Sequence, residues 1–210
     1  MKKAIATVIV IFILFSACKG EKKGKIEAKE EVKVEKTETV NNVDITASLV
    51  TWKGSKSGGS HHGTVSLKQG SLIIKDGAIT SGDFVIDMAS IKNEDLSPDY
   101  GAKLVKHLSS DDFFDIEKFP TARFIITSVE QKEDTLAVTG NLTIKDVTKS
   151  ITIPATLTEE GAKIFKSDTF AIDRADFNVK YGSKRFFPSL EDKIINDLVE
   201  MSFSIKVKGN

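Results

Sequence analysis

The 210-residue sequence contains a single cysteine, so no disulfide can form within the chain. Its 30 basic residues balance its 30 acidic residues, and a chain without excess positive charge has no electrostatic reason to bind a polyanion such as nucleic acid. The sequence also lacks a G-x-S-x-G nucleophile elbow and a glycine-rich phosphate-binding loop. These absences argue against a nucleic-acid partner and against the common hydrolases and nucleotide-binding enzymes.

The N-terminal residues are typical of an export signal. Lys2 and Lys3 precede the apolar run AIATVIVIFILFSA, which resembles a signal-peptide core and is too short to span a bilayer comfortably. Cys18 ends this run, and LFSAC resembles the lipobox of bacterial lipoproteins, in which the cysteine sulfur is alkylated by diacylglycerol. The resemblance implies a signal peptide over residues 1–17 and an exported lipoprotein of the bacterial cell envelope, anchored to a membrane, with its domain in the periplasm or at the cell surface. The alternative is an ordinary secreted protein with a stray thiol in its leader.

Residues 18–42 form a charged stretch that begins at the cysteine. Between Lys19 and Val40, seven Lys and six Glu alternate with few large apolar residues. Such a composition cannot bury enough surface to offset the entropy of ordering. Its charges nearly cancel, which makes it a poor ligand for anionic lipid or nucleic acid. We therefore expect a lipidated cysteine followed by a flexible tether.

From residue 43 to residue 210, the dominant period is two. The run LAVTGNLTIK places Leu136, Val138, Leu142 and Ile144 on one face and Asn141 on the opposite, polar face, and MSFSIKVK alternates in the same way. SITIPATL, ARFIITSVE, SLIIKDG, GDFVIDMASI and KSDTFAIDR are further β-rich runs separated by turn residues. Six or more such runs predict an antiparallel sheet, arranged as a sandwich or a closed barrel.

Only two segments have helical patterns. SPDYGAKLVKHLSS, residues 97–110, can be capped by Ser97 or Asp99 and carries an apolar stripe. SLEDKIIND, residues 189–197, is a shorter candidate. The fold class is therefore all-β with one or two short helices.

The stretch DDFFD contains Asp111, Asp112 and Asp115 and matches the magnesium-binding DDxxD pattern of prenyl-diphosphate synthases. That pattern works with a second ligand cluster inside a large all-helical fold, and the sequence supplies neither. We predict instead that the aspartates are exposed or cap turns at the end of a helix, and that Phe113 and Phe114 fill apolar space.

Three blocks carry a more specific resemblance. HLSSDDFFDIEKFPTARFIITS, then VTGNLTIKDVTKSITIPATL and then FAIDRADFNV are similar to consecutive blocks of the YceI-like family of bacterial secreted and periplasmic lipid-binding proteins. VTWKGSKSGGSHHGTVSLKQGSL and DLVEMSFSIK extend the resemblance over nearly all of residues 43–210. Asp146 and Asn178 stand where the family commonly has glycine, and both residue types tolerate left-handed or turn conformations.

The resemblance implies a lipocalin-like antiparallel barrel of eight strands whose apolar interior holds a long isoprenoid or other lipid tail. An eight-stranded barrel is wide enough for one small ligand or for side chains that fill it. The implied function is a non-enzymatic binding or carrier protein for a ligand such as a polyprenol or a quinone, without a cofactor. The alternative is a solidly packed interaction or accessory module of an envelope-stress or membrane redox system. A homodimer is compatible with either function.

Aromatic and basic side chains are the predicted ligand-binding residues. They are Trp52, Lys56, His61, His62, Phe84, Phe113, Phe114, Phe124, Phe170, Arg174, Phe177 and Tyr181. Counting by twos from Phe170 places Arg174 on an apolar face, where a buried guanidinium requires a partner. Asp176 or a residue near Asp173 can supply an ion pair. The alternative is that Arg174, with Lys56 and the two adjacent histidines, receives a polar head group at the barrel mouth.

The histidines allow two further interpretations. His61, His62 and His107 are enough in number for a metal site, but adjacent strand residues point to opposite faces and no recognisable ligand spacing is present. We therefore predict no metal site. A weak hydrolase or isomerase with His61 or His62 as its base is a third functional hypothesis, which the lack of an evident Ser or Asp partner disfavours.

Overall fold

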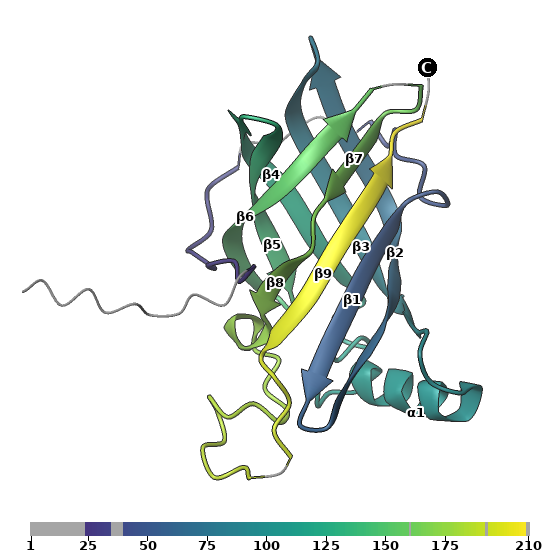
Figure 1. Ribbon diagram of the computed structural model, residues 1–210, viewed down its shortest axis with the longest axis vertical. Helices are drawn as coiled ribbons and strands as arrows, with labels where there is room; N and C mark the ends of the chain where they lie inside the picture. Colours follow the sequence, from purple (N-terminus) through teal and green to yellow (C-terminus); the bar gives the residue numbers. More distant parts are fainter. Residues whose placement is uncertain (1–23, 35–39, 160, 192, 209–210) are drawn as a thin grey trace, which may run out of the picture.

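Nine strands in the described parts of the chain form one antiparallel sheet that closes on itself (Figure 1). The computed structural model describes residues 24–34, 40–159, 161–191 and 193–208. The strands are β1 (Leu49–Lys56), β2 (Gly59–Lys75), β3 (Ala78–Asn93), β4 (Thr121–Lys132), β5 (Thr135–Ile144), β6 (Val147–Thr158), β7 (Ile164–Ser167), β8 (Phe170–Asp173) and β9 (Leu198–Lys206). β9 pairs with β1, and β7 and β8 pair with different parts of β9, so that together they take one strand position. The wall is therefore the predicted eight-stranded barrel.

Asp146 and Asn178, which stand where glycine is common, both have the left-handed backbone conformation that glycine readily adopts. Lys145 and Asp146 form the β5–β6 turn at φ 51° and 66°, the left-handed geometry that a tight two-residue hairpin favours. Asn178 adopts φ 58° directly after the short 3₁₀ helix η1 (Arg174–Phe177). Both substituted positions hold the conformation that glycine would adopt most easily.

The helix α1 (Pro98–Ser109) confirms the helix predicted over residues 97–110 and covers one end of the barrel (Figure 1). Pro98 suits the first helical turn because its φ is already helical, and Lys106 and His107 lie at the negative end of the helix dipole. Leu108, a residue of this helix, is buried. In the described part of the chain, no helix is long and apolar enough to cross a membrane.

The second predicted helix, over residues 189–197, does not form in the residues that the structure describes there. The backbone N–H of Ile195 donates to the carbonyl of Gly182, and Ile195 forms an isolated bridge with Lys56. Asn196 donates its backbone N–H to Ser55. Pairing with distant parts of the chain therefore replaces local helical hydrogen bonds.

The end of the barrel opposite α1 is filled by side chains, and we call it the packed end. Leu72, Ile79, Ile126 and Val138 are buried there. Gly140 contributes by its lack of a side chain, since a Cβ atom at this position would lie only 2.6 Å from a ring atom of Phe124. Side chains are closely packed at this end of the barrel.

The N-terminal segment Gly24–Val34 lies along the outside of the barrel. The backbone of Ala171 on β8 hydrogen-bonds with Gly24 and Ile26, each at 2.8 Å, and Ser150 on β6 exchanges two backbone hydrogen bonds with Lys29 at 2.8 and 2.9 Å. Among the described strands β8 pairs only with β9, and β6 pairs with β7 only through its last residues, Ala155–Thr158. The segment therefore occupies the gap in the wall between β8 and β6, and we call it the wall segment.

The wall segment differs from two expectations. A flexible tether was expected over residues 18–42, but Gly24–Val34 is held by backbone pairing to strand edges, which composition does not reveal. Asn141 was expected on the wet face of β5, but it is only 6% exposed because its side chain exchanges hydrogen bonds of 3.0 and 2.6 Å with the backbone of Val32. Unpaired edges of a sheet readily accept such an added strand.

Candidate functional site

A cavity of about 590 Å³ occupies the half of the barrel nearest α1, a volume typical of small-molecule sites. Side chains from all nine described strands and from α1 line it, and most of them are apolar. Lys56, Tyr181 and Lys193 also line it and are exposed, so the cavity opens to solvent where they lie. We call this the open end of the barrel.

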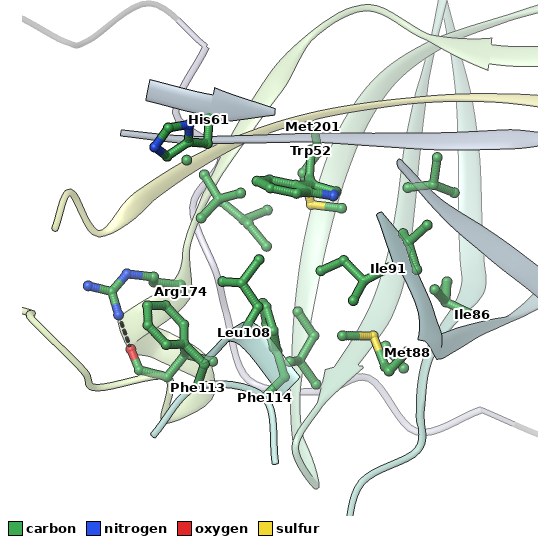
Figure 2. A pocket seen from close by; sticks show the side chains of 18 of the residues that line it. Trp52, His61, Ile86, Met88, Ile91, Leu108, Phe113, Phe114, Arg174 and Met201 are labelled. Atoms are coloured by element: carbon green, nitrogen blue, oxygen red, sulfur yellow. Dashed lines mark hydrogen bonds between the residues drawn. The ribbon is translucent and has the colours of Figure 1, made fainter. Parts of the chain in front are cut away.

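Strand β1 shows how the sequence builds the wall of the cavity. Its alternate residues Val50, Trp52, Gly54 and Lys56 all line the cavity, with the apolar residues deeper and the lysine at the mouth. Trp52 donates from Nε1 to the carbonyl of Lys92 at 3.2 Å. Figure 2 shows its ring beside Met201, its partner on β9. An ideal Cβ at Gly54 would meet no atom within 4 Å, so the cavity has open space beside this residue.

Aromatic rings close the inner end of the cavity. Phe84 and Phe165 stack with their ring centroids 6.2 Å apart, and Phe165 lies 4.9 Å from Phe203. Phe165 is 1% exposed, so these rings separate the cavity from the packed end. The cavity is therefore an apolar pocket with one closed end.

Phe113 and Phe114 close part of the open end beneath α1, beside Leu108 (Figure 2). The ring of Phe113 lies 5.1 Å from His107 and 5.4 Å from Tyr181, centroid to centroid. The phenylalanine pair fills apolar space, as the sequence predicts.

The aspartates of DDFFD lie in the turn that follows α1. Asp111 and Asp112 are exposed, and Asp115 adopts φ 49° in the turn. Asp112 lies 3.6 Å from Nε2 of His107. Within the described residues, no three His, Cys, Asp or Glu side chains gather as a metal site would require. The three carboxylates therefore belong to a turn that is in contact with solvent.

Arg174 lines the cavity but is held by the protein itself. Its guanidinium donates to the backbone carbonyls of Val179, Ile195 and Asn196 at 2.7, 3.1 and 3.1 Å, and it lies 3.1 Å from Asp197. Burial lowers the pKa of Arg174, and the nearby carboxylate of Asp197 opposes this effect. With each guanidinium nitrogen engaged, a structural role accounts for the residue.

Two details of the Arg174 prediction are wrong. Strand β8 ends at Asp173, so Arg174 belongs to η1 and counting by twos does not apply to it. Its ion-pair partner is Asp197, whereas Asp176 pairs with Arg185 at 2.6 Å. Asp197 is distant from Arg174 in the sequence, and the loop between them brings Asp197 back to η1.

His61 lies on β2 and has a carboxylate partner that the sequence did not suggest. Its Nδ1 lies 2.8 Å from Asp95, which also accepts hydrogen bonds from the backbone N–H of His62 and the side chain of Asn93. Burial raises the pKa of Asp95. The hydrogen bonds, of which that of His61 has the largest effect, lower the pKa by more than burial raises it, and the result is a pKa of about 2. Asp95 thus orients the imidazole of His61, and in the described part of the chain no hydroxyl group is hydrogen-bonded to the ring of His61 or His62.

The structure brings ten of the twelve predicted ligand-binding residues to one cavity. They are Trp52, Lys56, His61, Phe84, Phe113, Phe114, Phe124, Phe170, Arg174 and Tyr181. The other two lie elsewhere: the side chain of His62 is 56% exposed, and Phe177 is 1% exposed in the core without lining the cavity. Cys18, the predicted lipid-attachment residue, lies outside the described residues.

Several lining residues were missed, although some carried a signal. Ile86 and Met88 follow Phe84 at intervals of two on β3, and Leu104 and Leu108 are four apart on α1. Both spacings indicate a shared face. Asp95 carried no such signal, because only the fold brings it to His61.

Matches to known proteins cover the barrel. A family model described as the YceI-like domain matches residues 41–207. The chain belongs to the YceI-like family. A UPF0312 protein of Pseudomonas fluorescens (strain SBW25) is 34% identical over 135 residues, which cover 63% of this chain and 66% of the relative. A UPF0312 protein of Pseudomonas putida (strain ATCC 700007 / DSM 6899 / JCM 31910 / BCRC 17059 / LMG 24140 / F1) is 45% identical over 74 residues, 35% of this chain and 36% of the relative. The chain thus spans about a third of the length of some curated YceI-like relatives and two thirds of others.

Solved YceI-like structures share the barrel. BcnA of Burkholderia cenocepacia superposes with a TM-score of 0.64 at 22% identity, over 79% of this chain and 99% of BcnA. A polyisoprenoid binding domain from Saccharophagus degradans, implicated in plant cell wall breakdown, has a TM-score of 0.58 at 18% identity, over 80% of this chain and 97% of that domain. A YceI protein of Campylobacter jejuni has a TM-score of 0.51 at 20% identity, over 85% and 91% of the two chains. At these identities the likeness concerns the fold.

Proposed function

We propose that the protein is a membrane-tethered binding or carrier protein for a long-chain apolar ligand, an isoprenoid such as a polyprenol or a quinone, or another lipid. The observation that carries the proposal is the apolar cavity, which is closed at its inner end by Phe84 and Phe165 and open beside Lys56. Such a shape suits a molecule with a long tail and a polar head. The polyisoprenoid binding described for the Saccharophagus degradans neighbour supports this ligand class.

Burial of the tail supplies most of the affinity in this proposal. A ligand that buries about ten methylenes gains roughly 8 kcal/mol from the transfer out of water. That gain corresponds to micromolar binding when the cost of ordering the ligand is small. The solidly packed alternative is disfavoured, because the described side chains leave the interior open.

Native mass spectrometry of the full-length protein, compared with its denatured mass, tests the proposal. The wild type should carry a long-chain apolar adduct from its host. Gly54→Phe should lose it, because the new ring enters the open space at the mouth, whereas Gly54→Ala should keep it. Both variants should retain the melting temperature of the ligand-free protein. Lack of an adduct, together with no binding and no thermal stabilisation by added polyprenols or quinones, would falsify the carrier function.

The tether in this proposal is a lipid on Cys18 at the surface of a bacterial envelope membrane. A diacylglyceryl unit with an additional acyl chain gives the two or more buried chains that stable anchoring requires. Cys18→Ala should therefore leave the barrel folded but release the protein from the membrane fraction. Retention of the variant in that fraction would contradict the lipid anchor while leaving the ligand proposal intact.

A further inference from the structure

The position of Gly24 limits how far the proposed lipid anchor on Cys18 can lie from the cavity. Its carbonyl accepts a hydrogen bond from Ala171 at 2.8 Å, and it lines a second, outer hollow together with Lys56 and Asn196. Lys56 and Asn196 also line the ligand cavity, so Gly24 lies beside the open end. Cys18 is six residues before Gly24, and a chain of this length spans at most about 20 Å. A lipid on Cys18 therefore holds the open end close to the membrane.

The rim of the open end exposes aromatic side chains. Phe187 is 48% exposed and lies in the segment of residues 180–191, which begins beside the cavity mouth at Tyr181. Tyr181 is 41% exposed in the same segment, and Tyr100 on α1 is 65% exposed. Aromatic rings with a wet edge are suited to the boundary between lipid and water.

We propose that the open end docks on the surface of the bilayer that holds the lipid anchor, with Phe187 at the lipid boundary, so that the ligand passes between bilayer and cavity without entering water. The inference rests on the proposed lipid anchor and apolar ligand. A long tail that leaves through water exposes its methylenes at about 0.8 kcal/mol each, which makes aqueous exchange slow. Contact between mouth and bilayer removes that step.

A fluorescent label at the rim tests the orientation. Ser189→Cys, in the rim segment, receives an environment-sensitive fluorophore in the full-length protein, whose Cys18 sulfur is blocked by its diacylglyceryl group. Asp134→Cys, in the β4–β5 turn of the packed end, is the matched control. The labelled proteins are reconstituted in vesicles of phosphatidylethanolamine and phosphatidylglycerol with brominated acyl chains. The emission at 189 should shift to the blue and be quenched, whereas the emission at 134 should stay as in buffer.

The outcomes separate docking from the proposed function. Equal emission at the two positions overturns docking, even when mass spectrometry of the same sample shows an acylated Cys18 and a bound ligand. Energy transfer between two labels at 189 also overturns it and assigns the rim to a second copy of the chain. If the label at residue 189 lies in lipid but the protein carries no ligand adduct, the result supports docking and rejects the carrier function.

Exchange kinetics provide a second measurement. Phe187→Ser removes an exposed ring from the rim, and should slow transfer of a fluorescent polyprenol from vesicles by about tenfold without a change in melting temperature. Leu49→Ser is the matched control, because Leu49 is 44% exposed at the opposite end of β1. Equal transfer rates for the wild type and the rim variant would reject the docking surface.

Discussion

The packed end and the open end of the barrel use the same strands but different connections. At the packed end, β2–β3 and β4–β5 are joined by two-residue turns, so the strand ends and their side chains meet. At the open end, residues 94–120 and 174–197 make long returns that carry α1 and η1. These returns lie over and beside the cavity instead of filling it. Two-residue turns also occur at the open end, between β1 and β2 and between β5 and β6, so the two long returns are what set the hollow half of the barrel apart.

Two leucines on β2 offer the sharpest comparison between the ends. Leu72 is 1% exposed in the packed end, whereas Leu67 lines the cavity. Leu72→Ala should lower the free energy of unfolding by about 4 kcal/mol, because close packing leaves a void that cannot collapse. Leu67→Ala should cost about half as much in ligand-free protein, since its side chain already borders open space. Denaturant unfolding of ligand-free and ligand-loaded protein measures both, and equal costs in ligand-free protein would indicate that the interior is filled.

Phe113 and its acidic neighbours test how the open end is closed. Phe113→Ala should lower the free energy of unfolding by about 3 kcal/mol, because the ring is buried against Tyr181 and His107. Changing Asp111, Asp112 and Asp115 together to Asn should have little effect on stability or ligand content. Thermal unfolding with and without magnesium makes the measurement. Magnesium stabilisation that disappears in the Asn variant would restore the metal interpretation of DDFFD.

The wall segment can be tested through Asn141. Asn141→Ala should lower the free energy of unfolding by roughly 2 kcal/mol, because it leaves the backbone groups of Val32 without their partners. Amide hydrogen exchange should become faster across Gly24–Val34. Thr139→Ala, on the same face of β5 but bonded to Thr152, is the control and should leave exchange in that segment unchanged. Unaltered exchange in the Asn141 variant would show that the segment is held by other contacts.

The smallest expected effect is the pH dependence from Asp95 at the mouth. Its pKa is about 2 in the folded protein and 3.8 for the ordinary carboxyl, so its contribution to stability is present above pH 4 and is lost as the pH falls through 2. Asp95→Asn should remove this dependence, which should amount to less than about 1 kcal/mol because the carboxylate reaches solvent. Acid titration of the unfolding free energy compares the two proteins. Parallel curves from pH 6 to pH 2 would contradict the lowered pKa.

The barrel could be predicted because each strand repeats its period over many residues, as β5 does from Leu136 to Ile144. α1 was predictable because Leu104 and Leu108 mark one face of a helix. The partners Asp95 and Asp197 could not be predicted, since each meets His61 or Arg174 only after the chain has folded back across a long connection. The burial of Asn141 was equally hidden, because it depends on a segment that lies 109 residues away. The periodic spacing of apolar residues therefore predicts the strands of the barrel wall. The polar pairs cannot be predicted in this way, because they depend on how distant parts of the chain fold together.

The position of the wall segment has a consequence for any shortened form of this protein. A protein that begins at residue 43 would retain all nine described strands, yet the edges of β6 and β8 that now bond to Lys29, Gly24 and Ile26 would be bare. Bare strand edges recruit strands from other molecules. Self-association of such a truncated protein would then report the loss of its own N-terminal residues, and a dimer observed in that form would carry no information about the assembly of the intact chain.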